Sequence, residues 1–164
     1  MVQKRKQQVE TRLVAEWLAE FHRDHYFQTR VRLGSLPANV GAEDLDDGEA
    51  RLVHSAFARW ADAIVILEDR TILVEAKVIC HPTAIAQLML YKRLLPFSQF
   101  LNLRADKPVE PVLLYARPDP LVIQMAHEQG ISTVQFDPPW VADYLATRFV
   151  RQRTAPLSQT LAPA

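Results

Sequence analysis

The stretch ILVEAKVICHPTAIAQLMLYKRLL, residues 72–95, decides the fold. Its first half is a run of aliphatic residues, which is typical of a strand buried on both faces of a sheet. Glu75 and Lys77 interrupt this run two positions apart, so both side chains lie on one face of the strand. Ionisable groups inside a buried strand are costly unless they are paired or serve a function. This strand is therefore the first place to look for a functional site.

A helix is predicted directly after this strand, over residues 82–95. Pro82 suits the first helical position, where its missing N–H does no harm, and Pro96 ends the helix. Gln87 and Tyr91 are one turn apart and therefore share a face of this helix. They are either the polar side of an ordinary amphipathic helix or partners of the charged strand.

A hairpin is predicted over residues 60–78, WADAIVILEDRTILVEAKV, because two apolar strands flank a short polar turn. A loop of two or four residues centred between positions 69 and 70 places Asp62 opposite Lys77. Cross-strand partners share a face, so Asp62, Glu75 and Lys77 would then gather at one spot. The same register puts Ile64 opposite Glu75. A three-residue loop would instead place Asp62 on the other face.

The remaining periodicity predicts a single domain of the α/β (α+β) class, in which helices flank a mixed sheet. Its core order is helix, three strands, helix, strand, and a helix, a strand and a helix follow. The domain is expected to cover residues 1–153, with the acidic segment 34–58 as a loop or lid and residues 154–164 as a flexible or partner-ordered tail. The further elements are expected at residues 3–23, 25–33, 109–117, 121–131, 132–137 and 139–153.

Composition limits the class of protein. The chain has 164 residues, and 19 basic residues balance 19 acidic ones, so nucleic-acid binding would have to depend on local patches. Cys80 is the single cysteine, which excludes an internal disulfide and fits a reducing compartment. No segment approaches the roughly 18 apolar residues of a membrane span, and the first residues lack the apolar core of a signal peptide. A cytoplasmic protein without membrane partners is expected.

Glu10 lies in the middle of the apolar stripe of the first helix, which otherwise consists of Leu13, Val14, Trp17 and Phe21. It either belongs to a frayed first turn or points into a site. If the first turn frays, Glu16 and Glu20 are the alternatives, although both fall off the stripe.

The strand predicted over residues 25–33 places Gln28, Arg30 and Arg32 on one face, and Phe27, Thr29 and Val31 on the other. The arginines, with Lys92 and Arg93, either line a track for DNA or form a solvated face.

Clustered carboxylates favour metal chemistry. Two carboxylates about 5 Å apart repel each other and raise a pKa, whereas Mg²⁺ or Mn²⁺ would accept both as hard-oxygen ligands. A neighbouring lysine could then orient or polarise a water. This chemistry suits phosphodiester hydrolysis, where negative charge develops on phosphate oxygens. The alternative without chemistry is a buried ion pair between Asp62 and Lys77, with Glu75 held by an arginine.

These residues resemble the PD-(D/E)XK nuclease superfamily, which has the restriction-endonuclease-like fold. Asp62 followed by Glu75-Ala76-Lys77 matches its acidic motif, although Ala61 stands where a proline often precedes the aspartate. Gln87-Leu-Met-Leu-Tyr91 is similar to the Q-x-x-x-Y motif of the RecB-type and phage-exonuclease branch. Glu10 falls where that branch has a helix glutamate. The resemblance covers roughly residues 5–117.

The resemblance implies a deoxyribonuclease that depends on Mg²⁺ or Mn²⁺. Asp62, Glu75 and Lys77 would be catalytic, and the metal would be held by Glu10, Asp62, Glu75 and the Ala76 carbonyl. The DNA backbone would be bound by Gln87 and Tyr91, and the arginines Arg30 and Arg32 would line the DNA track.

Two alternatives stay open. One is a non-catalytic, structural nuclease-fold component of a phage or mobile-element assembly, which would be virion-associated if the gene is phage-encoded. The other is a dimeric junction-resolving or restriction-type endonuclease.

Overall fold

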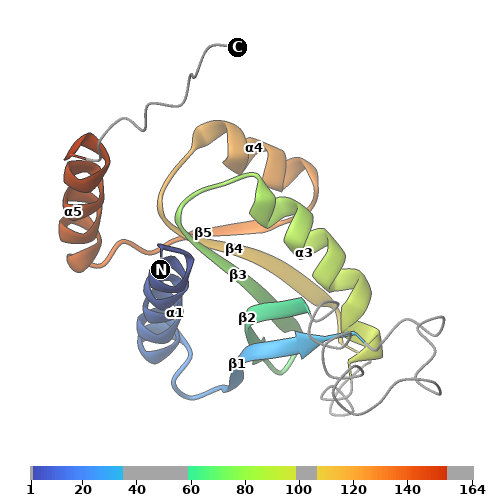
Figure 1. The fold of residues 1–164 in the computed structure, drawn as a ribbon. Coiled ribbons are helices and arrows are strands. Elements are labelled where there is room, and N and C mark those ends of the chain that lie inside the picture. Colours follow the sequence, from blue (N-terminus) through green and yellow to red (C-terminus); the bar gives the residue numbers. More distant parts are fainter. Residues whose placement is uncertain (1, 35–58, 99–106, 155–164) are drawn as a thin grey trace, which may run out of the picture.

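A computed structural model describes residues 2–34, 59–98 and 107–154 (Figure 1). The expected loop over 34–58 and the tail over 154–164 lie almost wholly outside these ranges. The described helices are α1 (Val2–Phe21), α3 (Thr83–Leu94), α4 (Pro120–Glu128) and α5 (Trp140–Thr154), with a 3-10 helix η2 (Leu95–Phe97) after α3. The strands are β1 (Tyr26–Leu33), β2 (Arg59–Ile66), β3 (Thr71–Ile79), β4 (Val109–Arg117) and β5 (Ser132–Gln135).

The five strands form one mixed sheet in the order β1-β2-β3-β4-β5. The pairs β1/β2 and β2/β3 are antiparallel, whereas β3/β4 and β4/β5 are parallel. The predicted class, a mixed sheet flanked by helices, and the predicted order of elements are therefore confirmed. Pro82 differs slightly from expectation, because it precedes the first helical residue of α3 instead of occupying that position. None of the helices in the described ranges is long and apolar enough to span a bilayer.

Helices cover both faces of the sheet (Figure 1). The α1 and α5 helices pack on one face, where the core includes Leu13, Trp17 and Val141. The α3 and α4 helices pack on the other face, where it includes Leu88 and Val122. Strand β3 lies between these two cores, and all its residues from 71 to 78 are buried. This double burial explains the aliphatic run in the sequence.

The β2–β3 register differs from the predicted one by two residues. Ala63 pairs with Val74 and Ile64 pairs with Leu73, so Ile64 does not lie opposite Glu75 as expected. The turn is centred one residue earlier than predicted, because the Leu67 N–H donates to the Arg70 carbonyl at 2.9 Å. A shift of two residues does not by itself move a strand's side chains to the other face. The predicted gathering of charged residues therefore survives the error.

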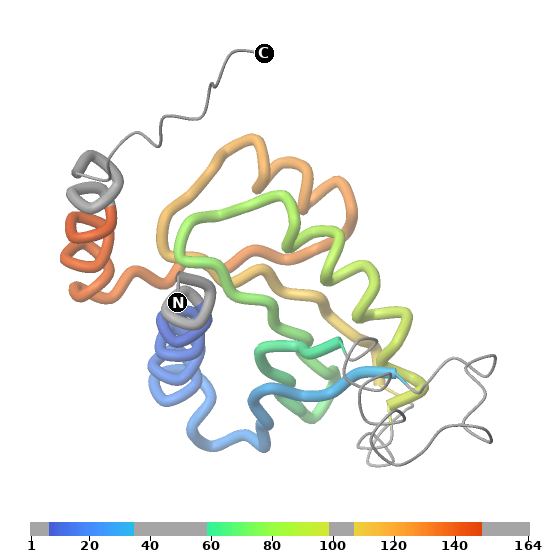
Figure 2. The backbone as a smooth tube through the Cα atoms, in the orientation of Figure 1, coloured from blue at the N-terminus to red at the C-terminus, as the bar shows by residue number. Residues whose placement is uncertain are grey.

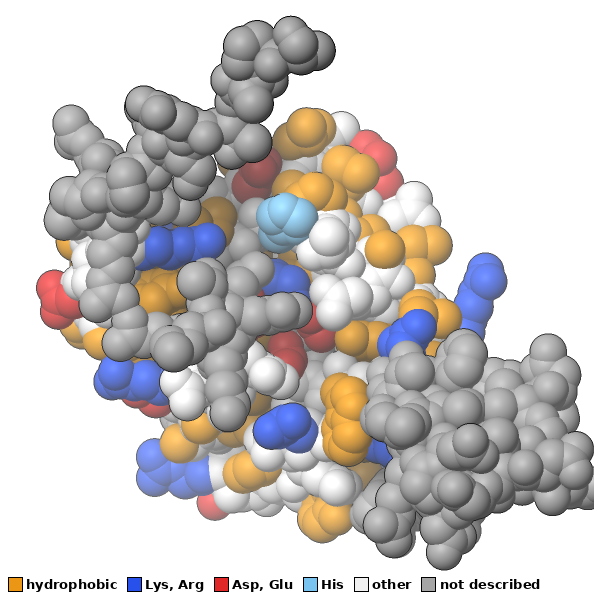
Figure 3. All heavy atoms as spheres, in the orientation of Figure 1, with side chains coloured by type: hydrophobic (Ala, Val, Ile, Leu, Met, Phe, Trp, Pro, Cys, Tyr) orange, Lys and Arg blue, Asp and Glu red, His pale blue; other side chains and the backbone are white. Residues whose placement is uncertain are grey.

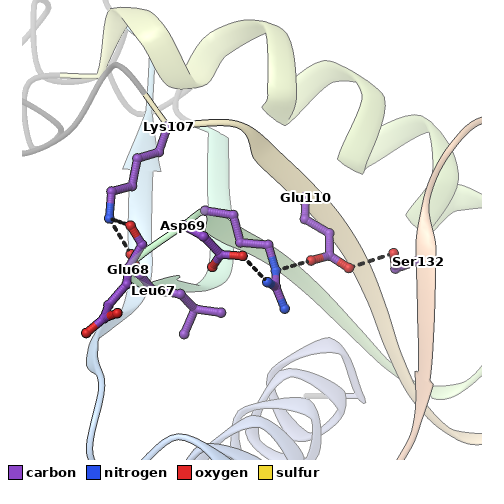
Figure 4. A network of polar contacts seen from close by, with 7 residues as sticks. Leu67, Glu68, Asp69, Lys107, Glu110 and Ser132 are labelled. Atoms are coloured by element: carbon purple, nitrogen blue, oxygen red, sulfur yellow. Dashed lines mark hydrogen bonds and ion pairs between the residues drawn. The ribbon is translucent and has the colours of Figure 1, made fainter.

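Polar contacts fix this turn to the neighbouring strands (Figure 4). Lys107 donates through Nζ to the Leu67 carbonyl at 2.6 Å and also contacts the Glu68 carbonyl. Arg70 donates to Glu110 on β4 at 2.7 Å, and Glu110 accepts from Ser132 on β5 at 2.7 Å. These contacts fix the β2–β3 turn at the start of β3, away from Glu75 and Lys77.

Beyond the Ala63–Val74 pair, β2 and β3 separate. Strand β2 continues to pair with β1 as far as Arg59, and β3 continues to pair with β4 as far as Ile79. Figure 2 shows the paired strands β1 and β2 turning away from β3 at this point. We call this separation the fork of the sheet. It leaves backbone groups of β3 without a strand partner on the β2 side.

The predicted alternation of β1 is wrong at Arg30. Arg30 has a left-handed backbone with φ of 51°, and the ladder skips its pairing with Asp62. Val31 and Gln28, predicted on opposite faces, both belong to the α3 side: Val31 is buried in that core, and Ile64, the partner of Gln28, lies there too. A residue with a left-handed backbone interrupts the extended conformation, so the side chains after it no longer alternate in phase with those before it.

Candidate active site

Asp62 occupies the fork. Its Oδ2 accepts a hydrogen bond from the Ala76 N–H at 2.8 Å. The carboxylate thus replaces the backbone acceptor that β2 would have supplied in a continuous ladder. The N–H and carbonyl of one strand residue point to the same neighbouring strand, so the Ala76 carbonyl is also directed into the fork. The fork therefore gathers a carboxylate and a backbone oxygen.

Glu75 and Lys77 lie on the adjoining strand, on the α3 side of the sheet. Both residues are buried, with 3% and 8% of their surface exposed, respectively. The Lys77 Nζ contacts Oε1 of Glu75 directly in an ion pair. The strand therefore carries a buried charge pair beside the carboxylate of Asp62.

The carboxylates are difficult to ionise together. Burial raises the pKa of Glu75 to about 7, and the negative charge of Asp62 adds to the effect, while Lys77 opposes it. Burial also raises the pKa of Asp62, against the lowering effects of the Ala76 N–H and of the positive charges of Lys77 and Arg30. The two acids therefore compete for positive charge, as predicted for a close carboxylate pair.

Lys77 supplies part of that positive charge. Burial alone would lower its pKa, but the charge and hydrogen bond of Glu75, with the charges of Glu10 and Asp62, raise it. Lys77 is therefore held as a cation among acids.

Glu10 reaches the same cluster from α1. Its Oε1 is buried, and its charge raises the pKa of both Glu75 and Lys77. Glu16 is used elsewhere, because it accepts from the Trp140 Nε1 at 2.6 Å and from Arg12 at 2.8 Å. Glu10 is thus the α1 carboxylate that accompanies the pair from β2 and β3.

Gln87 and Tyr91 border the cluster on α3. The Gln87 Nε2 donates to the Tyr91 hydroxyl at 3.0 Å. Burial and the charge of Glu75 raise the pKa of Tyr91 to about 12, and Asp62 contributes to the effect. The hydroxyl is thus neutral and lies near both acids.

The two arginines from β1 differ in their relation to the site. The charge of Arg30 acts on Asp62, whereas Arg32 lies further along the strand, opposite Trp60. Both are exposed. The Arg30 guanidinium also lies over the Trp60 ring, 5.9 Å from its centroid.

Two neighbours of the site were not predicted. Arg59 lies close enough to Tyr91 to lower its pKa, and Trp60 is an exposed aromatic residue two positions before Asp62. A signal was present in the sequence, since Arg59 and Trp60 lie three and two positions before the candidate aspartate on the same strand.

The donor set suits a hard divalent cation, because it consists of carboxylate oxygens with one backbone carbonyl. The face drawn in Figure 3 is hollowed near its centre, where acidic side chains lie between basic ones. In the part of the chain that the structure describes, no three His, Cys, Asp or Glu side chains stand together as a ready metal site. Glu75 is engaged by Lys77, and Asp62 by the Ala76 N–H. An ion would therefore compete with these contacts.

Comparison of the chain with protein-family models and with curated proteins finds no match. The resemblance to the nuclease superfamily therefore depends on the motif residues and their arrangement.

Proposed function

We propose that this protein is a nuclease with the restriction-endonuclease-like fold that hydrolyses DNA phosphodiester bonds with Mg²⁺ or Mn²⁺. The observation that carries the proposal is the convergence of Asp62 and Glu75, with Lys77, at the fork of the sheet. An apolar core gains nothing from two buried ionisable groups, Glu75 and Lys77, beside the half-buried carboxylate of Asp62. Such strained electrostatics are common at catalytic sites.

Each residue of the site has a separate role in the proposed reaction. Asp62 and Glu75, with Glu10 and the Ala76 carbonyl, would hold the ion, which supplies Lewis acidity toward a phosphate oxygen and activates a water. Lys77 orients the attacking water and offsets negative charge on the phosphate. Gln87 and Tyr91 donate hydrogen bonds to the phosphate backbone, and the raised pKa of Tyr91 keeps its hydroxyl protonated for this role.

A second candidate is a nuclease-fold protein that binds DNA without cutting it. The direct contact between Glu75 and Lys77 favours this reading, because the pair neutralises itself without an ion. In an active enzyme, Glu75 would have to exchange Lys77 for the cation. The two candidates therefore differ in whether a divalent cation displaces Lys77 from Glu75.

The test is cleavage of labelled DNA by the purified protein with Mg²⁺, with Mn²⁺ and with a chelator. The wild type should cut only with a divalent ion. Asp62→Asn should abolish cutting, since the amide keeps the hydrogen bond from Ala76 but loses the charge. Glu68→Gln is the matched control, because Glu68 is an exposed carboxylate at the far end of the same hairpin. Cleavage that persists in Asp62→Asn would refute the proposal, and no cleavage by the wild type would favour the second candidate.

A further inference from the structure

Trp60 differs from the other two tryptophans of the chain. Trp17 is buried in the α1 core, and Trp140 is half-buried with its indole N–H bound by Glu16. Trp60 instead exposes 46% of its surface, although it lies on β2 only two residues before Asp62. Exposing a large aromatic residue forgoes hydrophobic stabilisation, so its position beside the site calls for an explanation.

Positive charge surrounds this ring. The guanidinium of Arg30 lies over it at 5.9 Å, and Arg32 is its partner in the β1–β2 ladder. Arg30 adopts a left-handed backbone, an arrangement that is unfavourable for a residue with a side chain and that is enriched at ligand sites. The charge of Arg30 also acts on Asp62. The same arginine thus contacts the aromatic ring and influences the candidate catalytic acid.

An exposed aromatic face flanked by guanidinium groups fits a nucleobase with its phosphate. A base inside a duplex is covered on both faces by its neighbours in the stack, so only an unpaired base or a base at a duplex end offers a face to Trp60. We infer that Trp60 is a stacking platform for an unpaired nucleobase, and that Arg30 holds the adjoining phosphate. This inference rests on the proposed function, and it makes single strands or frayed ends the preferred substrate.

Tyr26 provides a matched control. It lies on β1, which pairs with β2, and is 60% exposed, but its partner is Ile66 at the end of β2 that leads into the β2–β3 turn. Six ladder positions separate that pair from the Trp60 pair, which corresponds to roughly 20 Å along the strands. Removing Tyr26 therefore deletes a comparable exposed ring far from the fork.

The experiment measures binding of a fluorescent single-stranded DNA oligonucleotide and of a closed circular duplex, which has no ends, with a chelator present to prevent cleavage. Trp60→Ala should weaken binding of the single strand by roughly 5- to 150-fold, the range expected for one lost base–aromatic stack. Binding of the duplex should change little. Trp60→Phe should restore most of the affinity because a phenyl ring still stacks, and Tyr26→Ala should resemble the wild type.

The inference is overturned if Trp60→Ala and Tyr26→Ala behave alike, if single strand and duplex lose affinity equally, or if the wild type does not bind the single strand. Thermal melts of each variant exclude misfolding as the cause. The outcome is separable from the nuclease proposal. If the protein cuts DNA and Trp60→Ala changes neither cleavage nor binding, only the stacking inference is refuted. If binding depends on Trp60 but no cleavage occurs, only the nuclease proposal is refuted.

Discussion

Glu75 and Lys77 bury opposite charges side by side on one strand, and each makes the burial of the other tolerable. Replacing one partner leaves the other charge desolvated, which typically costs about 3–5 kcal/mol. Glu75→Gln and Lys77→Met should each lower the free energy of unfolding by about that amount at pH 8, and the double variant should lose much less than the sum. Urea denaturation of the four proteins measures this coupling. Additive losses would mean that the two side chains do not interact as the structure has them.

The pKa of Glu75 makes stability depend on pH. Its ordinary value of 4.5 is raised to about 7 in the fold, chiefly by burial. Between these values the folded protein keeps a proton that the unfolded chain has released, so the free energy of unfolding falls as the pH rises. The fall amounts to at most about 3 kcal/mol over this window.

The measurement is the difference in unfolding free energy between the wild type and Glu75→Gln at pH 5, 6 and 7. The stability of the wild type relative to the variant should decrease as the pH rises. His22 has its pKa lowered by burial, by His25 and by Arg70, so it contributes with the opposite sign. Because both proteins contain His22, this contribution cancels in the difference. A difference that does not vary with pH would contradict the raised pKa of Glu75.

Among the secondary-structure elements, the fork depends on the Asp62 side chain, which accepts the hydrogen bond that a neighbouring strand would otherwise accept from the Ala76 N–H. Asp62→Asn retains an oxygen that can accept from the Ala76 N–H and should leave stability nearly unchanged. Asp62→Ala leaves this N–H without its acceptor, which should cost about 1–3 kcal/mol. Thermal or urea unfolding of the two variants distinguishes them. Equal stabilities would show that the hydrogen bond does not hold the fork.

Helix α1 offers a second comparison, between Glu10 and Glu16. Glu10→Gln should weaken metal-dependent DNA cleavage, because Glu10 adds its charge to Glu75 and Lys77. Glu16→Gln should leave cleavage unchanged and cost less than about 1 kcal/mol in stability, since its pairing with Arg12 is largely exposed. Rates measured at saturating Mn²⁺ test this. The assignment of Glu10 is wrong if the two variants cut equally well.

Elements with regular periodicity could be predicted from the sequence, and irregular ones could not. The strand over residues 109–117 was predicted with its observed bounds. Gly130, predicted to stop the helix before it, follows the end of α4 and has a left-handed φ of 66°. The predicted register of the β2–β3 hairpin was wrong by two residues, because several turns fit the same polar residues. The alternation of β1 failed at Arg30, since nothing in a local pattern predicts a left-handed arginine.

At the scale of the whole molecule, the candidate site unites residues that are far apart in the sequence. Alternation and helical spacing could place Glu10, Glu75 and Tyr91 on the correct faces of their elements. They could not predict the fork, because local periodicity does not show where β2 stops pairing with β3. The exposed Trp60 is a consequence of the same tertiary arrangement. The sequence therefore indicated the members of the cluster better than its surroundings.

We propose that the carboxylates at the fork bind a divalent cation, and calorimetric titration of the protein with Mn²⁺ measures this binding. The wild type should bind Mn²⁺, Asp62→Asn should lose this binding, and Glu68→Gln should bind as the wild type does. Binding releases protons because Glu75 must ionise, so the observed heat should vary with the ionisation enthalpy of the buffer. A wild type that binds no Mn²⁺, or an Asp62→Asn variant that binds it equally well, would contradict the account.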